Sequence, residues 1–300
     1  MDFNHIALVG LGLIASSIAL NIKSKKNRIK ITGYSRTKKT REEARKINFC
    51  TVCDNYEDCI KEANLVILCV PVGAMGDTME KIAPYLSKSA IVTDVGSVKE
   101  SVILEVQKNL PKDVFFVPAH PLAGTENSGP SAGFASLFEN RWCILTPSKN
   151  VPIEIIKKVK FFWEQLGSNV VEMDAKHHDL VLSVTSHAPH LIAFTMVGVA
   201  DEFSKVTNSE VINYSAAGFR DFTRLAASDP IMWRDVFLNN KDAALEILGR
   251  FTEELFTLQK AIRKKDGEYL LKYFERTRKI RRSIISAGQD TAEPNFGRKE

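Results

Sequence analysis

The chain has 300 residues, of which 44% are hydrophobic and 26% are charged, and its formal net charge is +5. This length has room for two domains that each bury a core, and the composition is that of a globular protein without low-complexity tracts. The modest positive charge suits anionic small molecules and is too dispersed to indicate nucleic-acid binding. The five cysteines are an odd number, which favours free thiols in a cytoplasmic protein.

The first predicted strand and the first predicted helix lie in the apolar segment at residues 6–22. It is shorter than the ~20 residues of a membrane-spanning helix and contains Ser16, Ser17 and Asn21. The residues before it include an acid but no Lys or Arg, so the pattern of a signal peptide is missing. The segment is therefore predicted to lie in a globular core, and no membrane association is expected.

Short β-rich runs alternate with helical patterns as far as residue 173. Runs such as 65–70 are apolar on both faces, which is typical of parallel strands covered by helices. This alternation predicts a doubly wound α/β domain of the Rossmann type. The expected strands are residues 5–9, 30–34, 65–70, 90–94, 114–117, 143–146 and 169–173, with helices between them that include 13–23, 38–46 and 75–83.

Long helical patterns replace the strands after Asp174. The predicted helices are residues 178–202, 209–217, 230–263 and 266–286, and Asp229 followed by Pro230 is a favourable helix start. The polar tail from Ala287 is expected to fray. Two domains are therefore predicted: a dinucleotide-binding domain over residues 1–173 and an all-helical substrate and dimerisation domain over 174–300, through which the chain is expected to form a homodimer.

A glycine pattern between the first strand and the first helix predicts the dinucleotide site. Gly10 permits a tight turn, Gly12 allows the backbone to approach a pyrophosphate, and Ala15 keeps helix and strand close. Leu13 and Ile14 stand at the start of the helix, where free N–H groups favour an anion. The strand, turn and helix context makes this pattern more specific than glycines alone.

The end of the second strand bears on the choice between NAD and NADP. NAD enzymes usually carry an acid there, but this chain has Ser35, Arg36 and Thr37, which are suited to bind a 2′-phosphate. NADP is therefore favoured as the cofactor. The alternative is that Lys38 and Lys39 only begin a solvated helix and that NAD is accepted without the acid.

Three further segments follow expected strands: CVPV (69–72), TDVGSVKES (93–101) and PAHPLAGTE (118–126). Ligands of doubly wound sheets bind beyond the carboxyl ends of the strands, so these segments are expected to meet, with Val70 and Pro71 against the cofactor. Together with VTSHAPHLIAF (184–194) and GFRDFTRLAASDPIMWRD (218–235), they closely resemble the prephenate and arogenate dehydrogenase family of tyrosine biosynthesis.

The resemblance implies the oxidative decarboxylation of a cyclohexadienol, either prephenate or arogenate. A hydride leaves C4 of the ring for the nicotinamide, the 4-hydroxyl group loses its proton, and CO₂ departs as the ring becomes aromatic. The product is 4-hydroxyphenylpyruvate or tyrosine. Such a reaction needs a base near the hydroxyl group, a hydride acceptor against C4, and cations for the carboxylates.

His120 is the candidate base, because a neutral imidazole near pH 7 accepts a proton. Pro118 and Pro121 restrict the backbone around it, which holds one ring nitrogen toward one substrate atom. Ser97 matches the family's serine on the neighbouring loop and is expected to orient the histidine or the hydroxyl group. The alternative for His120 is a histidine that satisfies only loop backbone groups.

Arg224 is the candidate anchor for a substrate carboxylate, because a guanidinium binds a carboxylate bidentately. Arg220 and Asp221 precede it by one helical turn and are expected on the same face. Thr125 and Glu126 would line the mouth of the pocket. The alternatives are a surface Arg–Asp pair and, for Glu126, a solvated loop carboxylate.

Two histidines and a tryptophan in the helical part complete the candidate site. By the resemblance, His190 faces the substrate, and Trp233 forms an aromatic wall from this chain or its partner. Without the resemblance, a lone tryptophan such as Trp233 would more often be part of a core, and the role of His187 is left open between the site and the core. No metal is predicted, because hydride transfer to a nicotinamide needs none and Cys50-x-x-Cys53 has no second ligand pair.

The sequence departs from the family pattern at Ala15, Ser35 and Ala217, which replace a frequent glycine, a frequent acid and part of a glycine-rich run. No chorismate mutase or amino-acid-sensing domain is expected, so any inhibition by tyrosine is expected to act at the active site. Two other functions are less compatible. The β-hydroxyacid dehydrogenases use a lysine of the helical domain as catalytic group, and a dinucleotide sensor would not need Ser97, His120 or Arg224.

Overall fold

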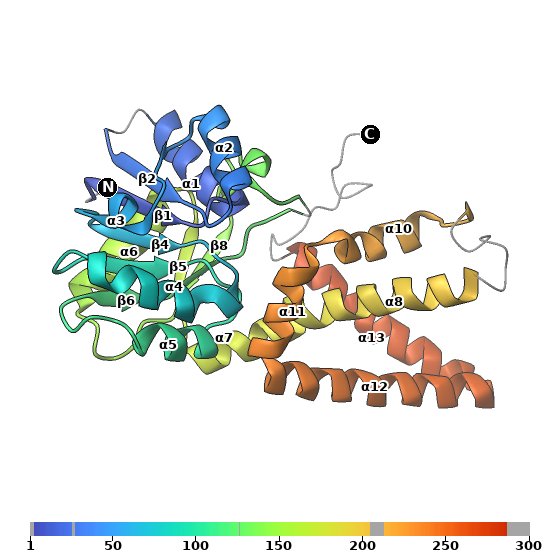
Figure 1. Cartoon of the computed structure of the whole chain (residues 1–300). Coiled ribbons are helices and arrows are strands. Elements are labelled where there is room, and N and C mark those ends of the chain that lie inside the picture. Colours follow the sequence, from blue (N-terminus) through green and yellow to red (C-terminus); the bar gives the residue numbers. More distant parts are fainter. Residues whose placement is uncertain (1–2, 26–27, 126, 205–212, 287–300) are drawn as a thin grey trace. The chain divides into compact units, whose positions relative to one another are not determined.

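The computed structural model describes residues 3–25, 28–125, 127–204 and 213–286. The chain divides into two compact units, Met1–Ala244 and Leu245–Glu300. Figure 1 labels the elements of both. The first unit holds all of the described strands and the helices up to residue 239. The second holds most of α12 (Lys241–Lys264) and all of α13 (Gly267–Ser286).

A six-stranded parallel sheet forms the centre of the first unit. Its strand order is β3-β2-β1-β4-β5-β6, the order of a dinucleotide-binding doubly wound sheet, so the predicted fold class is confirmed. The strands are β1 (His5–Val9), β2 (Lys30–Tyr34), β3 (Thr51–Val52), β4 (Leu65–Leu68), β5 (Ile91–Asp94) and β6 (Phe115–Val117). The helices between them are α1 (Leu13–Ser24), α2 (Lys38–Ile47), α3 (Tyr56–Ile60), α4 (Met75–Ile82) and α5 (Glu100–Gln107), with short turns η1 (Val72–Ala74) and η2 (Ala83–Tyr85).

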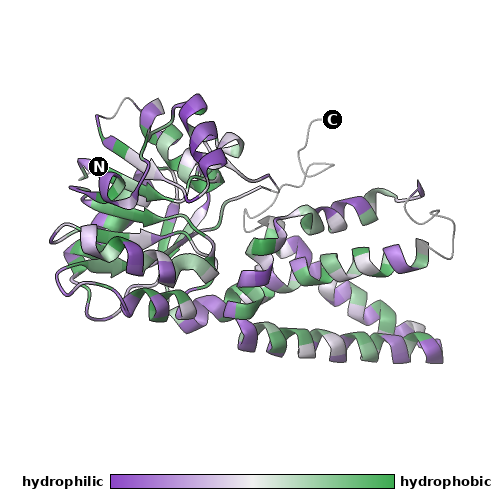
Figure 2. Cartoon of the chain, in the orientation of Figure 1, coloured by the Kyte–Doolittle hydropathy of each residue, from purple (hydrophilic) through white to green (hydrophobic). Residues whose placement is uncertain are grey.

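Both faces of this sheet are covered, which explains why its strands are apolar throughout. Alternate side chains of β1 enter two different cores: Ile6 and Leu8 pack with α1, whereas Ala7 and Val9 pack with α4. All five residues of β1 are buried. Figure 2 shows the same distribution, with hydrophobic strands inside and hydrophilic stretches on the helices around them.

A second, three-stranded sheet carries the candidate base. It joins β7 (Ala119–Pro121), β8 (Trp142–Leu145) and β9 (Asn169–Glu172), with β7 antiparallel to β8 and β8 parallel to β9. η3 (Pro130–Ala132) and α6 (Ile153–Gln165) lie between these strands in the sequence. The sequence predicts β8 and β9 but places His120 after a strand. The structure instead places His120 inside β7, opposite Ile144.

The helical part of the first unit differs from the prediction where the helices are interrupted. A π-helical turn, η4 (Ser183–His187), separates α7 (Ala175–Leu182) from α8 (Ala188–Ser204), so residues 178–202 are not one regular helix. Of the helix predicted at 209–217, residues 209–212 lie outside the described residues, residues 214–216 are not helical, and α10 (Ala217–Thr223) begins at the last predicted position. The turn η5 (Arg224–Ala227) and α11 (Pro230–Asn239) follow.

The helix predicted at 230–263 is two helices, because Asn240 interrupts it. Asn240 leaves the helical region with φ −117° and ψ 39°, and its side chain is buried. At the start of α11, Asp229 caps the helix as predicted by accepting from the Ile231 and Met232 N–H groups, both at 2.9 Å. The tail from Ala287 lies outside the described residues.

The segment Ala175–Phe203 is long and apolar enough to cross a membrane, judged by length and composition. Several of its polar side chains are nevertheless buried by protein, among them His178, Asp179 and His187. Their hydrogen bonds to other parts of the first unit give this segment a role in the candidate site.

Candidate active site

The turn after β1 has the geometry of a pyrophosphate site. Gly10 has φ +97°, and a Cβ atom there would lie 2.4 Å from the Cys69 carbonyl oxygen, so a side chain is excluded. A Cβ atom on Gly12 would meet no atom within 4 Å, which leaves open space at the start of α1. No side chain caps α1, so the N–H groups of Leu13 and Ile14 remain for an anion. The residues present fit a bound dinucleotide.

Arg41 holds the loop after β2 in place. One guanidinium nitrogen of Arg41 donates to the carbonyl oxygens of Ser35 at 2.7 Å and Arg36 at 3.0 Å. Thr37 caps α2, with its hydroxyl accepting from the Thr40 N–H at 3.3 Å. Within the described residues, the side chains of Ser35 and Arg36 make no hydrogen bond. These two of the three predicted phosphate ligands could therefore bind a phosphate without breaking a hydrogen bond to the protein.

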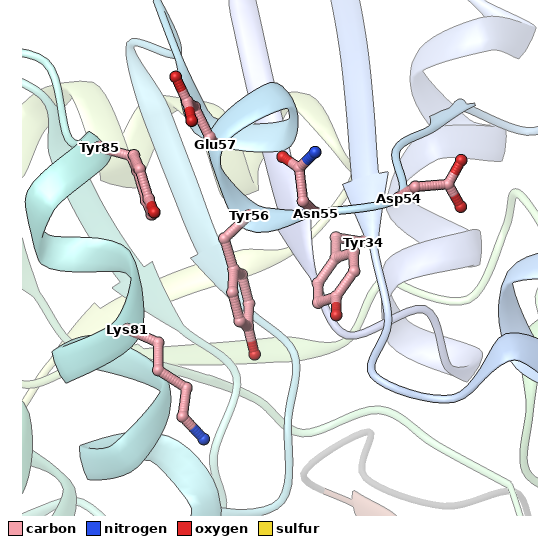
Figure 3. Close-up of a pocket in the computed structure, with 7 residues that line it drawn as sticks. All are labelled: Tyr34, Asp54, Asn55, Tyr56, Glu57, Lys81 and Tyr85. Carbon is pink, nitrogen blue, oxygen red and sulfur yellow. The ribbon is translucent and has the colours of Figure 1, made fainter.

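A pocket of about 330 Å³ lies beside this loop (Figure 3). The Tyr34 ring at the end of β2 and the Tyr56 ring at the start of α3 flank it, with centroids 4.4 Å apart. Lys81 and Tyr85 contribute the opposite wall. Since the adenosine half of a dinucleotide lies at the end of the second strand in this fold, the pocket is placed to take it.

The segment after β4 lies next to the glycine turn. A Cβ atom on Gly10 would be 3.1 Å from Val70, and Pro71 is exposed directly after it. Both therefore lie at the carboxyl edge of the sheet, as predicted for residues against the cofactor.

His120 is 8% exposed and lies between two buried prolines. Its Nδ1 atom is 2.9 Å from Nε2 of His178, and the two rings meet edge to face. His178 is fully buried, and its Nδ1 atom is 2.8 Å from a carboxylate oxygen of Asp179. The sequence thus predicts the candidate base, and the structure adds two partners that the sequence did not assign.

A buried ion pair fixes the backbone next to His120. The Lys99 ammonium donates to Asp94 at 2.5 Å and to the Ala119 carbonyl oxygen at 2.8 Å, and Lys99 and Asp94 are fully buried. The other Asp94 oxygen accepts from the Ala119 N–H at 3.1 Å. Because both charges are paired, their main effect is to hold the residue before His120 in place.

Burial keeps the histidines of this cluster neutral. It lowers the pKa of His120 well below the ordinary value of 6.5, and the neighbouring His178, Lys99 and His187 side chains lower it further, because each disfavours a second positive charge beside it. Burial also lowers the pKa of His178, although Asp179 opposes the shift. A neutral His120 near pH 7 is ready to accept a proton.

His190 and Trp233 lie together in the helical part. Their rings stack with centroids 3.8 Å apart at an angle of 25°. Trp233 is buried in its own chain, and its Nε1 atom has no hydrogen-bond partner among the described residues. The Nδ1 atom of His190 is 2.8 Å from the Ser186 carbonyl oxygen, so this ring nitrogen donates and Nε2 remains an acceptor.

Arg224 begins η5, and its positive charge helps to lower the pKa of His190, after burial as the larger cause. The candidate anchor is therefore near the predicted substrate-facing histidine. Arg220 and Asp221 are exposed on the preceding helix α10. A guanidinium beside an aromatic pair suits a ring that carries a carboxylate.

Four candidate residues remain: Ser97, Thr125, Glu126 and His187. Ser97 is half-buried in the loop after β5, and its hydroxyl makes no hydrogen bond within the described residues. Thr125 is exposed and accepts from the Asn127 N–H at 3.2 Å, and Glu126 lies outside the described residues. His187 is fully buried, and burial lowers its pKa to about 4. Its Nδ1 atom accepts from Asn240 at 3.1 Å, which links it to the packing of the helices.

Sequence reasoning missed His178, Asp179, Lys99 and Asn240 as parts of the cluster around the base. Lys99 stands in a quoted motif, and the adjacent His178 and Asp179 stand at the start of the helical pattern. An adjacent His–Asp pair at a domain boundary is a weak signal. Asn240 has none, because its role depends on the break between α11 and α12.

Parallel strands in this order, with a glycine turn after the first, are typical of enzymes that transfer a hydride to or from a nicotinamide dinucleotide. A buried neutral histidine at the carboxyl edge adds the base that oxidation of an alcohol requires. The class is that of the NAD(P)-dependent dehydrogenases.

Within that class, the chain belongs to the prephenate dehydrogenase family. Residues 18–172 match the family model "Prephenate dehydrogenase, nucleotide-binding domain", and residues 174–276 match "Prephenate dehydrogenase, dimerization domain". The family that the motifs resemble is thereby confirmed.

Individual relatives agree with the family models. A cyclohexadienyl dehydrogenase of Zymomonas mobilis is 44% identical over 283 residues, which are 94% of this chain and 96% of that protein. A prephenate dehydrogenase of Bacillus subtilis is 35% identical over 97% of this chain and 78% of its own length. Among solved structures, prephenate dehydrogenase of Aquifex aeolicus in complex with hydroxyphenyl propionate and NAD⁺ has a TM-score of 0.88 and 33% identity, covering 95% of this chain and 99% of that one.

Proposed function

We propose that this chain is a prephenate or arogenate dehydrogenase that oxidatively decarboxylates its substrate and favours NADP over NAD. The observation that carries the proposal is His120, a neutral buried imidazole at the carboxyl edge of the dinucleotide-binding sheet. Family membership and relatives named cyclohexadienyl and prephenate dehydrogenase support the choice of substrate class.

The residues divide the reaction between them. His120 accepts the proton of the 4-hydroxyl group as the C4–H bond breaks, so that loss of CO₂ then leaves an aromatic ring. The bound nicotinamide supplies the hydride acceptor. Arg224 binds a substrate carboxylate bidentately, and the stacked His190 and Trp233 rings offer an apolar wall with one ring nitrogen free to accept. Ser97, on the loop after β5, orients the hydroxyl group or the imidazole.

The loop after β2 supports NADP. Ser35 and Arg36 follow the strand without an acid, and α2 begins with two lysines and no acidic residue in its first turn. A 2′-phosphate bound at this loop would therefore meet donors and positive charge. Two carboxylates, those of Asp54 and Glu57, line the adjoining pocket, and Asp54 is paired with Arg45 at 2.7 Å. NAD is the alternative, since the pyrophosphate site at Gly12 serves both dinucleotides.

The homodimer, too, is part of the proposal. The family model that covers residues 174–276 is a dimerisation domain, and helices α12 and α13 expose large apolar side chains that a partner would cover. We place the enzyme in the cytoplasm, supported by its five free cysteines, and expect neither nucleic-acid nor membrane partners.

Initial rates with the four combinations of prephenate or arogenate and NAD or NADP test this function directly. Reduction of the dinucleotide is followed by its absorbance, and kcat/KM is compared between pairs. We expect turnover of at least one of the two substrates and a higher kcat/KM with NADP than with NAD. No turnover in any combination would contradict the proposed reaction, whereas a preference for NAD would contradict only the cofactor assignment.

A further inference from the structure

We infer that Asp179 and His178 act as positioning residues that hold His120 in the tautomer whose Nε2 lone pair is available to the substrate. The inference deepens the proposed function and rests on the assignment of His120 as the base. His178 and Asp179 lie on helix α7, whereas His120 lies on strand β7.

The first step is the state of Asp179. One of its carboxylate oxygens accepts from the Lys99 N–H at 2.8 Å and the other from the Glu100 N–H at 2.9 Å. These N–H groups stand at the start of α5, where the helix dipole favours a negative charge. Each oxygen of the carboxylate faces a backbone N–H donor and so acts as an acceptor. The hydrogen in its 2.8 Å contact with His178 must therefore be carried by Nδ1 of His178.

The position of the hydrogen on His178 determines the position of the hydrogen on His120. A neutral imidazole with its hydrogen on Nδ1 has a lone pair on Nε2. Nε2 of His178 is 2.9 Å from Nδ1 of His120, and two lone pairs would repel at that distance. The hydrogen between the rings is therefore on Nδ1 of His120. Neutral His120 then has its own lone pair on Nε2, the ring nitrogen that makes no hydrogen bond within the described residues.

The pair also assists the base after proton transfer. When Nε2 of His120 takes a proton, the imidazolium charge lies two hydrogen bonds away from the Asp179 carboxylate. Burial makes that attraction stronger than it would be in water. The competing positive charge of Lys99 is paired with Asp94, and His187 is kept neutral by burial. Without the pair, His120 would be free to take the other tautomer and turn its lone pair toward the protein.

Burial leaves the ring nitrogens of His178 dependent on protein partners. His178 and Asp179 are 0% and 2% exposed, so water does not satisfy the ring nitrogens in their place. The Asp179 backbone is fixed as well, since its carbonyl oxygen accepts from the Asn240 side chain at 2.9 Å. The contact of α7 with the start of α5 thus determines the tautomer of a residue on β7.

The first test reads the tautomers in the wild-type enzyme. Long-range ¹H–¹⁵N spectra of protein labelled at its six histidines distinguish hydrogen on Nδ1 from hydrogen on Nε2, and single substitutions assign each signal. We expect both His120 and His178 to carry hydrogen on Nδ1. A wild-type spectrum with the hydrogen of His120 on Nε2 would overturn the inference whether or not any variant folds.

The second test removes the acceptor. We expect His178→Phe to lower kcat by about 10- to 100-fold, to change KM by less than about threefold, and to shift His120 toward the Nε2–H tautomer. His178→Gln offers an oxygen acceptor and should recover part of kcat together with the Nδ1–H tautomer. The matched control is His177→Phe on the same helix, because His177 is exposed and should leave both readouts unchanged.

The outcomes distinguish a failure of the positioning role of His178 and Asp179 from a failure of the proposed function. A folded His178→Phe enzyme with kcat within about twofold of wild type would show that His178 and Asp179 do not position the base, even if His120→Asn were inactive. Retained activity in His120→Asn would instead show that His120 is not the base, and would overturn the proposed mechanism.

Discussion

At the scale of single residues, the site depends on keeping an imidazole uncharged inside the protein. Burial disfavours the protonated form of His120, and the partner of its Nδ1 atom is another imidazole, that of His178, at 2.9 Å. Asp179 is separated from His120 by His178, so the carboxylate sets the tautomer of the base without holding it in the doubly protonated, charged form. This arrangement gives a base that is neutral at physiological pH and still has an anion near enough to support its charged form.

The pH dependence of kcat/KM follows from the lowered pKa of His120. The reaction needs the unprotonated base, so the rate is lost as pH falls through that pKa. Because the pKa lies well below 6.5, kcat/KM should be constant from pH 6.5 to 8 and decline only at lower pH. Rates measured across pH 4.5–8.5, with enzyme stability checked at each pH, give the profile. An acidic limb centred at or above pH 7 would contradict this account of the base.

Arg224 should act on binding more than on turnover. Arg224→Ala removes a charged hydrogen-bonding group worth ~1.5–3 kcal/mol, so KM for the substrate should rise by about 10- to 150-fold while kcat changes little. Arg224→Lys keeps the charge without the bidentate fork and should recover only part of the affinity. Arg250, an exposed arginine paired with Glu246 at 2.9 Å, is the matched control for loss of an arginine. An unchanged KM in Arg224→Ala would remove the anchor from this role.

At the scale of secondary structure, the sequence predicts most of the sheet because burial on both faces leaves a strong signal. The strands from β1 to β6 were predicted within about two residues, except for the two-residue β3. β7 was missed because a three-residue strand that ends in proline has neither the length nor the composition of a strand. It forms because β8 supplies its pairing partners, which lie far away in the sequence.

The interruptions of the helices were missed for a related reason. The π-helical turn at Ser183–His187 and the break at Asn240 both lie in sequences with ordinary helical patterns. Each places polar side chains in contacts with distant residues, such as Asn240 with His187. Local propensity does not encode such contacts, so the residues around His120 could be predicted only as far as their own motifs reached.

The turn between β1 and α1 offers a test in which two glycines should respond differently. Gly10→Ala places a methyl group against the Cys69 carbonyl oxygen at positive φ, so it should lower stability by about 1–3 kcal/mol. Gly12→Ala meets no protein atom within 4 Å, so thermal unfolding should be nearly unchanged while the NADP dissociation constant rises about tenfold or more. Thermal melts and fluorescence titration measure both. Equal NADP affinity in Gly12→Ala and wild type would place the pyrophosphate elsewhere.

At the scale of the whole molecule, the helices of the second unit expose several large apolar side chains. On α12, Phe256 and Ile262 are each 63% exposed, and on α13 Leu271 is 59% exposed. Such side chains are typical of an interface between subunits, because water contact with each of them costs free energy. The proposed homodimer would bury these side chains, which contrast with the fully buried β1 strand.

The oligomeric state gives the corresponding measurement. One chain has a mass of 33.6 kDa, so light scattering should report a dimer of about twice that mass. Phe256→Glu places a charge on the apolar surface and should shift the protein toward monomer, whereas Lys260→Glu, an exposed residue one turn away, should leave the dimer intact. A wild-type protein that stays monomeric at micromolar concentration would contradict the proposed homodimer.

Proton removal by His120 is the central claim, and the turnover of His120→Asn tests it most directly. Asparagine keeps a polar side chain of similar reach but accepts no proton near neutral pH. We expect kcat to fall by ~10²–10⁴ with the better of the two substrates, while KM and the NADP dissociation constant stay close to wild type. A folded variant that turns over at the wild-type rate would show that another group accepts the proton.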